Sequence, residues 1–260
     1  MPAPIDETFL LSKFPRIGGN DGTDTGLTSV TIVLPAYNEA DAIGPMLDAT
    51  VQTMNALVND YEVIVVDDGS RDATSQIVTS FSQLHSQVRL VRHDMNQGYG
   101  AAVFDGLVHA RKDWVFLTDS DRQFDLNEIS KLLAFMDKAD LIVGYRAPRR
   151  DPFRRKLFGW GWSMFVTLLF GYTARDIDCA FKLIRRSVIV RLEKEVKSYG
   201  AAFSAELLVR AKRAGFTIQE VPITGHRPRV SGCATGNRLD VILRAFKELL
   251  RLRLTFGQGG

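Results

Sequence analysis

Hydrophobic residues in the first half of the chain follow two patterns that alternate several times. Short β-branched and apolar runs predict strands at residues 29–35, 61–66, 88–92, 114–118 and 140–144. Between these runs, apolar positions recur every three or four residues, which predicts helices at residues 39–54, 72–81 and 127–136. A further helix is expected to open within residues 96–100 and to run to about residue 111. Repeated β-α units favour an α/β fold with a mostly parallel central sheet, flanked by helices and joined by right-handed crossovers.

The second half contains a long uncharged run at residues 157–174. Its 18 residues reach the lower limit for a membrane-spanning helix, but three glycines dilute it. Trp160 and Trp162 lie near its start, where amphipathic rings favour an interface. We expect a helix that lies on a membrane surface or covers the active site; a buried core helix is the second reading and a true span the third. Three further elements are predicted after this run: a helix that ends at about residue 214, a strand at 215–223 and a basic amphipathic helix at 237–254.

Polar side chains follow the ends of three predicted strands. Residues 35–39, the pair Asp67-Asp68 and the triplet Asp119-Ser120-Asp121 all occupy such positions, and ligands bind at the carboxyl ends of parallel strands. Because Asp119, Asp121 and Gln123 alternate along the chain, their oxygens can converge on one small volume. Hard cations such as Mg²⁺ or Mn²⁺ prefer oxygen ligands of this kind, alongside the phosphates of a nucleotide diphosphate. The alternative is a turn that caps a helix.

The other polar loops have two readings each. A carboxylate at Asp67 or Asp68 suits a ribose or a base edge, whereas the alternative is a turn in which Asp67, Gly69 and Ser70 cap the next helix, the favoured role for Ser70. The glycines of residues 96–100 favour a tight turn before a helix over a phosphate contact. No G-x-G-x-x-G follows the first strand, so a dinucleotide-binding fingerprint is absent from the sequence.

Composition narrows the class of protein further. The chain has 260 residues, is 45% hydrophobic, and carries a net charge of +3, which is too mild to indicate nucleic acid as a partner. Cys179 and Cys233 are the two cysteines and form no CxxC pair, so a zinc site or disulfide framework is not expected and a reducing compartment fits best. Residues 1–28 lack the apolar core of a signal peptide, and we expect a flexible tail.

Four segments together resemble glycosyltransferase family 2, the inverting nucleotide-sugar transferases of GT-A fold. They are PAYNEA at residues 35–40, VVDDGSRDAT at 65–74, NQGYGAA at 96–102 and LTDSDRQ at 117–123. The resemblance implies a nucleoside and donor site, and a metal that bridges the two donor phosphates. The implied donor-binding residues are Pro35, Tyr37, Glu39, Asp68, Asp119 and Ser120, and the implied metal ligands are Asp119, Asp121 and Gln123.

The second half resembles the branch of this family that includes dolichyl-phosphate mannose synthases and other polyprenyl-phosphate glycosyltransferases. DIDCAFK at residues 176–182 is similar to a family segment, with Lys182 where Arg is frequent and Cys179 where Gly is frequent. Glu206 matches a family position on a helix, and residues 226–232 resemble a loop that closes over the donor diphosphate, although the Ser-Lys that usually follows its glycine is missing. Arg229 or His226 would then supply that contact. The implied catalytic residues are Asp121, Arg146, Asp176, Lys182 and Arg229.

The expected activity is inverting transfer of a hexose, mannose or glucose, from a nucleotide diphosphate sugar of the GDP-mannose or UDP-glucose type to dolichyl or undecaprenyl phosphate. A lipid phosphate is already ionised at neutral pH and needs no general base. The basic cluster from Arg146 to Lys156 would bind this phosphate and anionic lipid. We expect a peripheral protein at the cytoplasmic membrane face, with a tail at 1–28, a catalytic domain at 29–236 that includes an acceptor segment at 146–175, and a C-terminal helix at 237–260.

Three alternatives remain open. A soluble family member would glycosylate a hydroxyl and need a base, for which Asp178 is the candidate. A non-catalytic module would bind a nucleotide sugar without turnover. A sugar nucleotidyltransferase is disfavoured, because the sequence has no glycine-rich, lysine-bearing loop near its start. The sequence leaves open whether the chain forms a homo-oligomer.

Overall fold

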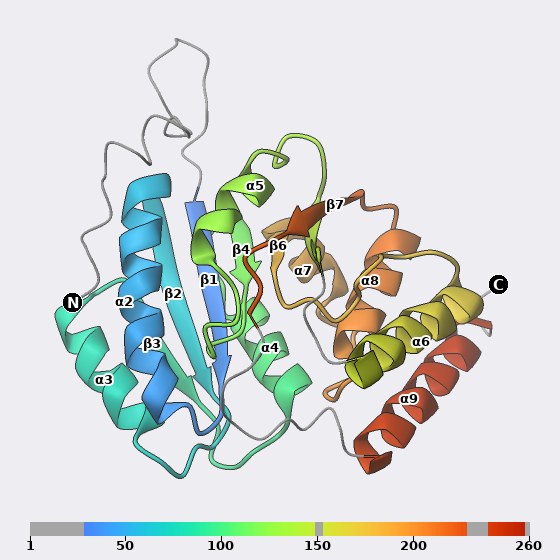
Figure 1. The fold of residues 1–260 in the computed structure, drawn as a ribbon, viewed down its shortest axis with the longest axis horizontal. Helices are drawn as coiled ribbons and strands as arrows, with labels where there is room; N and C mark the ends of the chain where they lie inside the picture. The colour runs from blue at the N-terminus through green and yellow to red at the C-terminus, as the bar shows by residue number, and fades with distance from the viewer. Residues whose placement is uncertain (1–28, 149–152, 228–238, 258–260) are drawn as a thin grey trace.

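A computed structural model describes residues 29–148, 153–227 and 239–257 of the chain. Its centre is a seven-stranded sheet in the order β3-β2-β1-β4-β6-β5-β7, with helices on both faces (Figure 1). The strands are β1 Ser29–Ala36, β2 Asp60–Asp67, β3 Val88–Arg92, β4 Trp114–Leu117, β5 Leu141–Arg146, β6 Lys182–Arg185 and β7 Ile218–Ile223. The helices are α2 Ala40–Leu57, α3 Thr74–Leu84, α4 Tyr99–Val108, the 3₁₀ turn η1 Leu126–Glu128, α5 Ile129–Leu133, α6 Phe153–Phe170, α7 Arg186–Leu192, α8 Phe203–Arg213 and α9 Leu239–Gly257.

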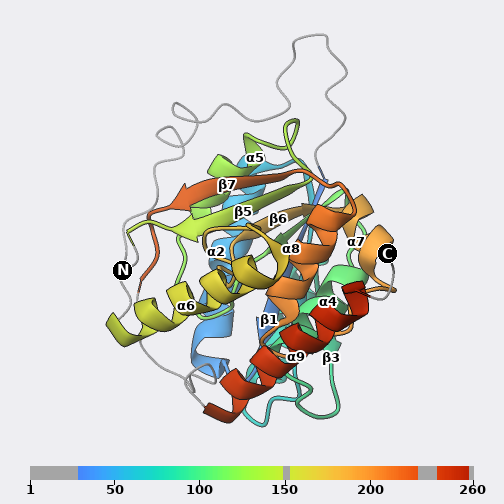
Figure 2. The same ribbon diagram turned by 90° about the vertical axis from the view of Figure 1, so that its right-hand side faces the viewer.

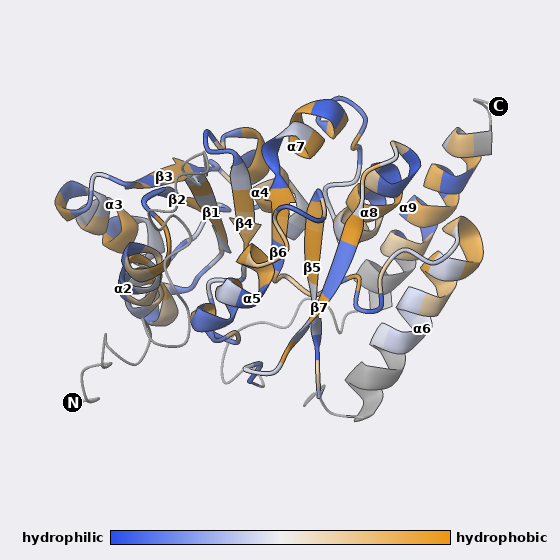
Figure 3. Cartoon of the chain, turned by 90° about the horizontal axis from the view of Figure 1, so that it is seen from above, coloured by the Kyte–Doolittle hydropathy of each residue, from blue (hydrophilic) through white to orange (hydrophobic). Residues whose placement is uncertain are grey.

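Alternating side chains of the strands build two cores. In β1, Val30, Ile32 and Leu34 pack in one core, whereas Val33 packs in the other. The first core lies under α2, α3, η1 and α5, and the second lies under α4, α7 and α8. Helices α6 and α9 lie side by side at one flank of the molecule (Figures 1 and 2). The orange strands at the centre of Figure 3 are apolar because both of their faces are covered.

The predicted mostly parallel sheet and the predicted alternation of strands and helices up to residue 144 are confirmed. Strand β6 and helix α7 were not predicted, and β6 lies antiparallel between β4 and β5. Its four residues, KLIR, are too few to show a period, and the sequence placed Lys182 at the end of a functional segment instead. Because β6 runs backwards, its first residue lies at the same sheet edge as the last residues of β4 and β5.

Several predicted boundaries shift. The helix predicted at 127–136 is shorter: Asp125 caps a 3₁₀ turn by accepting from the Asn127 amide, and α5 ends at Leu133. The helix predicted within residues 157–174 ends at Phe170, because Gly171 adopts a left-handed φ of 81°. Strand β1 begins at Ser29, as predicted, while the tail predicted at 1–28 and the boundary predicted between residues 236 and 237 lie outside the described residues.

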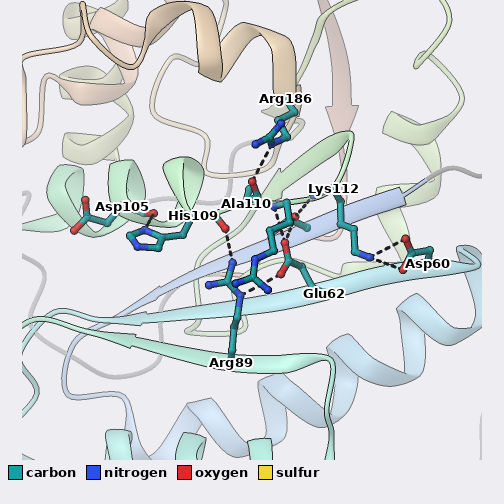
Figure 4. A network of polar contacts seen from close by, with 10 residues as sticks. Asp60, Glu62, Arg89, Asp105, His109, Ala110, Lys112 and Arg186 are labelled. Carbon is teal, nitrogen blue, oxygen red and sulfur yellow. Dashed lines mark hydrogen bonds and ion pairs between the residues drawn. The ribbon is translucent and has the colours of Figure 1, made fainter.

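A polar network closes the sheet edge at which β1, β2 and β3 begin (Figure 4). The buried Glu62 carboxylate accepts from the Thr31 hydroxyl at 2.8 Å, the Arg111 amide at 2.7 Å and Arg89 Nε at 3.1 Å. Nearby, Lys112 Nζ pairs with the Asp60 carboxylate at 2.6 Å. Burial tends to raise the pKa of Glu62, but these donors outweigh it and hold the pKa below its ordinary value. This edge is therefore internally satisfied, and the opposite edge carries the candidate site.

Candidate active site

Strand order brings the predicted site residues to one edge of the sheet. β2, β1 and β4 are neighbours and all end there, and β6 begins there. Lys182 is paired in register with Leu117 of β4 on one side and Val143 of β5 on the other. The turn that carries Asp119 and the end of β5 that carries Arg146 therefore flank Lys182. The predicted convergence of strand ends is confirmed.

The turn after β4 is held in a defined shape by bonds to β1. The Thr118 amide donates to the Val33 carbonyl at 3.2 Å, and the Ser120 hydroxyl donates to the Pro35 carbonyl at 2.9 Å. Arg122 has a φ of 59°, which is uncommon for a residue with a side chain. Asn38, in the loop after β1, has a similar φ of 53°. Such backbone persists where the surroundings enforce it, and it is frequent at functional sites.

The chemistry of this turn fits a hard divalent cation. Asp121 accepts from the Gln123 amide at 3.1 Å and from the Gln123 side-chain nitrogen, so the two side chains meet. Rotating the Gln123 amide by half a turn would present its oxygen at the same place. Together with Asp119, this set offers two carboxylates and one amide oxygen, as Mg²⁺ or Mn²⁺ prefers. In the described part of the chain no group of three His, Cys, Asp or Glu residues is placed to hold a metal ion. A site built on Asp119, Asp121 and Gln123 would need water and phosphate oxygens as further ligands.

The loop after β2 is a tight turn in which both aspartates serve the backbone. Asp67 accepts from the Ser70 amide at 2.9 Å and from the Ser75 hydroxyl, which confirms its predicted role in the turn. The predicted helix-cap role of Ser70 is wrong. Its hydroxyl accepts from the Asn38 amide at 2.9 Å and so joins the β1 and β2 loops. The first amide of α3, that of Thr74, instead donates to the Asp72 carboxylate at 3.0 Å.

Asp68, a predicted nucleoside contact, is 3% exposed. Its carboxylate accepts from the Gln97 and Gly98 amides, each at 2.8 Å, and is 2.7 Å from His93 Nδ1. The structure therefore gives Asp68 a second role, holding the loop before α4, and contact with a nucleoside stays a prediction. Among the other predicted donor-site residues, Pro35 is buried, Glu39 is half-buried and Tyr37 is 41% exposed.

Gly98 and Gly100, at the start of α4, play the backbone role that the sequence favoured. Gly98 has a φ of 102°, which L side chains rarely adopt. A Cβ on Gly100 would lie 2.6 Å from the backbone of Tyr199, where the Ala101 amide donates to the Tyr199 carbonyl at 3.0 Å. Glu206 supports that contact, because its buried carboxylate accepts from the Ser198 amide at 2.7 Å and Arg210 Nε at 2.6 Å.

Tyr99 is a site residue that sequence reasoning missed. Its side chain is hydrogen-bonded to Asp119. Although 41% of the whole residue is exposed, the hydroxyl end lies among acidic groups. Burial of that end, followed by the charge of Asp119 and then Asp178, raises the pKa of Tyr99 well above its ordinary value. A hydroxyl that stays protonated here can only donate toward Asp119. The sequence feature that could have identified Tyr99 is its position between two glycines, which places it at the start of α4.

Lys182 is a buried cation at the centre of the cluster. It is 1% exposed, and its Nζ donates to the Cys179 carbonyl. Burial lowers the pKa of Lys182, and the nearby groups Cys179, Asp178, Asp176 and Asp119 oppose that effect. Burial also raises the pKa of the Cys179 thiol to about 12, so this side chain is a neutral thiol at physiological pH. The charges of the three aspartates thus all act on one buried lysine side chain.

Arg146 and Asp176 form a two-pronged buried ion pair. Arg146 Nε lies 2.7 Å from Asp176 Oδ2, and a terminal guanidinium nitrogen lies 2.8 Å from Oδ1. The side chains are 7% and 8% exposed. Such a pair fixes the guanidinium plane, which matches the geometry of phosphate as well as carboxylate. The neighbouring Asp178 is exposed, in contrast to Asp176.

The loop after β7 reaches back to the acidic turn. The Arg227 amide donates to the Gln123 carbonyl at 2.8 Å, and the ring of buried His226 lies 5.2 Å from that of Phe124. Glu128 anchors the same loop by accepting from the Thr224 amide at 2.8 Å and the Gly225 amide at 3.0 Å. Arg229 and the Arg149–Arg150 pair lie outside the described residues, as does the remainder of the loop predicted to close over the donor.

The sheet order and the acidic turn after β4 place the protein in the class of GT-A folds. Within that class the chain belongs to glycosyl transferase family 2, whose sequence model matches residues 31–192. Solved structures agree on the fold. Glucosyl-3-phosphoglycerate synthase from Mycobacterium tuberculosis, in complex with Mn²⁺ and UDP-glucose, has a TM-score of 0.63 at 19% identity, covering 96% of this chain and 82% of that one. Mannosyltransferase PcManGT from Pyrobaculum calidifontis, in complex with GDP-mannose and Mn²⁺, has a TM-score of 0.61 at 18% identity, covering 94% and 70%.

The chain is also similar to several curated relatives. Dolichyl-phosphate beta-glucosyltransferase ALG5C of Trichomonas vaginalis is 35% identical over 211 residues, which are 74% of this chain and 62% of the relative. ALG5D of the same organism is 30% identical, covering 78% and 69%. The dolichyl-phosphate beta-glucosyltransferase of Saccharomyces cerevisiae is 26% identical over 263 residues, covering 91% and 78%. The chain therefore spans 62% to 78% of the length of these relatives.

Proposed function

We propose that the protein transfers a hexose, glucose rather than mannose, from a nucleotide diphosphate sugar to a polyprenyl phosphate. The observation that carries this proposal is the convergence of the acidic turn with Lys182 and the Arg146–Asp176 pair at one sheet edge. The relatives named above are dolichyl-phosphate glucosyltransferases, which supports both the acceptor class and the sugar.

On the donor side, Asp119, Asp121 and Gln123 would hold Mg²⁺ or Mn²⁺, which would neutralise charge on the departing diphosphate. Pro35, Tyr37 and Glu39 would line the nucleoside pocket, with Asp68 beneath it and Ser120 bracing the turn. Tyr99 would orient the Asp119 carboxylate through its hydroxyl. Arg229 would add a cation to the diphosphate from the loop after β7.

On the acceptor side, Arg146 and Lys182 would attract the lipid phosphate, and Asp176 would hold the Arg146 guanidinium in orientation. A phosphate oxygen would attack the anomeric carbon from the face opposite the nucleotide. The new bond joins that oxygen to the carbon, the broken bond releases the nucleoside diphosphate, and the configuration inverts. Because the attacking oxygen is already ionised, no side chain needs to remove a proton.

Peripheral membrane contact through α6 and α9 is part of this proposal. One face of α6 packs on α9, with Trp162 and Phe165 about 5 Å from Phe246 between ring centroids. On the other face, Trp160, Met164 and Leu168 are 60%, 52% and 81% exposed, spaced one helical turn apart. The exposed residues of α9 combine Arg244, Lys247 and Arg251 with Leu250 and Leu254. Apolar and basic side chains together suit the anionic cytoplasmic face of a membrane. No described helix is both long and apolar enough to cross the bilayer.

The test is a matrix of purified protein with labelled UDP-glucose or GDP-mannose, Mg²⁺ or Mn²⁺, and dolichyl phosphate, undecaprenyl phosphate or unphosphorylated dolichol. We expect lipid-linked glucose with the phosphorylated lipids and none with dolichol. Product from a hydroxyl acceptor, lost in Asp178→Asn with donor binding intact, would instead favour the alternative in which exposed Asp178 acts as a base. Tight donor binding without turnover on any acceptor would indicate a binding module.

A further inference from the structure

His93 lies just after β3 and joins two carboxylates from different elements. Its Nδ1 is 2.7 Å from Asp68 Oδ1, at the end of β2, and its Nε2 is 2.8 Å from Asp105 Oδ2, on α4. The ring is 4% exposed, as is the Asp68 side chain, while the Asp105 side chain is 39% exposed. A neutral imidazole has one N–H, so one of its nitrogens would face a carboxylate with a lone pair. Two short contacts to carboxylates therefore indicate an imidazolium that donates to both.

The Asp68 carboxylate also holds the loop before α4 in place. Asp68 accepts from the Gln97 and Gly98 amides, and the Met95–Asn96 backbone packs so closely on Gly69 that an added Cβ there would lie 2.6 Å from it. Next along the chain, Ser70 accepts from the Asn38 amide of the β1 loop. The three loops at the nucleoside end of the site thus meet at the Asp68-Gly69-Ser70 turn. His93 holds the Asp68 carboxylate of this turn in place.

We propose that protonated His93 is a positioning residue that links Asp68 to Asp105 and so preorganises the nucleoside end of the donor site. This role rests on the proposed function, since it takes a nucleotide sugar as the ligand. When His93 loses its proton, one of the two links becomes a repulsion between lone pairs, and the residue 95–98 loop loosens. Donor affinity is then highest while His93 is charged.

The charged groups around His93 support this direction. Burial alone would lower the pKa of His93, but hydrogen bonds to Asp68 and Asp105, followed by their charges, outweigh it and raise the pKa above its ordinary value of 6.5. Asp67 of β2 contributes its carbonyl to the His93 amide, while its carboxylate is engaged by Arg92 at 3.5 Å. His109, just after α4, contacts the Asp105 carbonyl rather than its carboxylate. Because the pKa of His93 is raised in the folded protein, the His93 link between Asp68 and Asp105 is fully present below pH 6.5. It is lost as the pH rises through the pKa that His93 has in the folded protein.

Two measurements test the proposal on the full chain. Carbon-13 NMR of the histidine rings, assigned with His93→Gln, gives the protonation of His93 directly. Calorimetric titration with UDP-glucose and Mg²⁺ across pH 6–8.5 gives donor affinity, and neither the diphosphate nor the uracil of UDP-glucose changes its charge appreciably in this range. We expect affinity to fall about tenfold, or about 1.4 kcal/mol, as His93 deprotonates. Asp105→Asn should move both transitions to lower pH, because it removes one of the two charges. His109→Gln is the matched control and should leave both unchanged.

The outcomes separate this proposal from the proposed function. A neutral His93 at pH 6 would overturn it, as would a pH profile of affinity that Asp105→Asn leaves in place. If no nucleotide sugar binds at any pH, the proposed function fails, and hydrogen exchange at the Gln97 and Gly98 amides decides the structural part. Their protection factors should fall through the His93 transition in the native protein, and the fall should move to lower pH in Asp105→Asn. Protection that does not follow His93 would refute the link itself.

Discussion

The two halves of the site are built by different means. In the donor half, from β1 to β4, short polar side chains of one loop satisfy backbone amides of the next, as Ser70 does for Asn38 and Asp68 for Gly98. In the acceptor half, from β5 to β7, long charged side chains pair with each other, as Arg146 does with Asp176. Beyond that pair lies α6, with its exposed apolar face.

The difference corresponds to what each half would bind. A nucleotide diphosphate sugar is compact and polar, so a rigid frame of backbone amides and carboxylates can be matched to it with little reorganisation. A lipid phosphate presents one charged group at the end of a long apolar chain. A fixed guanidinium, a buried ammonium and an apolar surface suit such a molecule. The predictions below test this contrast, beginning with the largest expected effect.

Removing the Asp121 carboxylate from the acidic turn should abolish the function of the donor half, which is metal-dependent donor binding. We expect Asp121→Ala to reduce glucosyl transfer by about 10³-fold, the range found when a group that stabilises developing charge is lost. Metal-dependent binding of UDP-glucose should disappear with it, as measured by calorimetry with and without Mn²⁺. Asp137→Ala, which changes an exposed aspartate between α5 and β5, is the control. Unchanged donor affinity in Asp121→Ala with metal present would refute the assignment of this turn.

Breaking the buried ion pair should destabilise the acceptor half. Arg146→Met leaves the Asp176 carboxylate buried without its guanidinium, and we expect about 3 kcal/mol less stability in urea unfolding. Arg191→Met, which removes an exposed pair with Glu195, should cost less than about 1 kcal/mol. Equal losses in the two variants would mean that the Arg146–Asp176 pair is not the structural centre of this half.

The donor half has its own buried carboxylate in Glu62, at the opposite edge. Glu62→Gln should lower stability by about 2 kcal/mol at pH 7, because bonds to a charged group are replaced by weaker ones. Since the folded pKa of Glu62 lies below its ordinary value of 4.5, its contribution is present above pH 4.5 and is lost as pH falls through the folded pKa. Urea unfolding at pH 7 and in that acid range should therefore give a smaller difference between variant and native protein at the lower pH.

The smallest expected effect concerns the surface of α6. Leu168→Glu should weaken binding to anionic phospholipid vesicles about fivefold, or about 1 kcal/mol, in a sedimentation assay, while transfer to a short, water-soluble polyprenyl phosphate stays unchanged. Leu84→Glu is the matched control, because Leu84 is also more than four-fifths exposed but lies on α3, at the far side of the donor half. Equal weakening by both substitutions would indicate a nonspecific effect of added charge.

Much of the donor half follows from the sequence because its determinants are local. The strand runs of β1 to β4 and the residues that follow them are contiguous, and the chain pattern fixes which strand ends carry Asp67, Asp68 and the acidic turn. Glycine at positions 98 and 100 likewise indicated a backbone constraint that the structure confirms. The error at Ser70 arose because its partner, the Asn38 amide, is 32 residues away.

The acceptor half was harder to predict because its contacts join distant segments. The sequence predicted functional roles for Arg146, Asp176 and Lys182, but only the tertiary structure decided that the first two pair with each other and that the third is buried. The deciding element is β6: four residues give no readable period, yet their antiparallel insertion brings Lys182 between β4 and β5. Sequence pattern thus set the strands, turns and family of this protein, whereas long-range pairing and burial set which charges share the site.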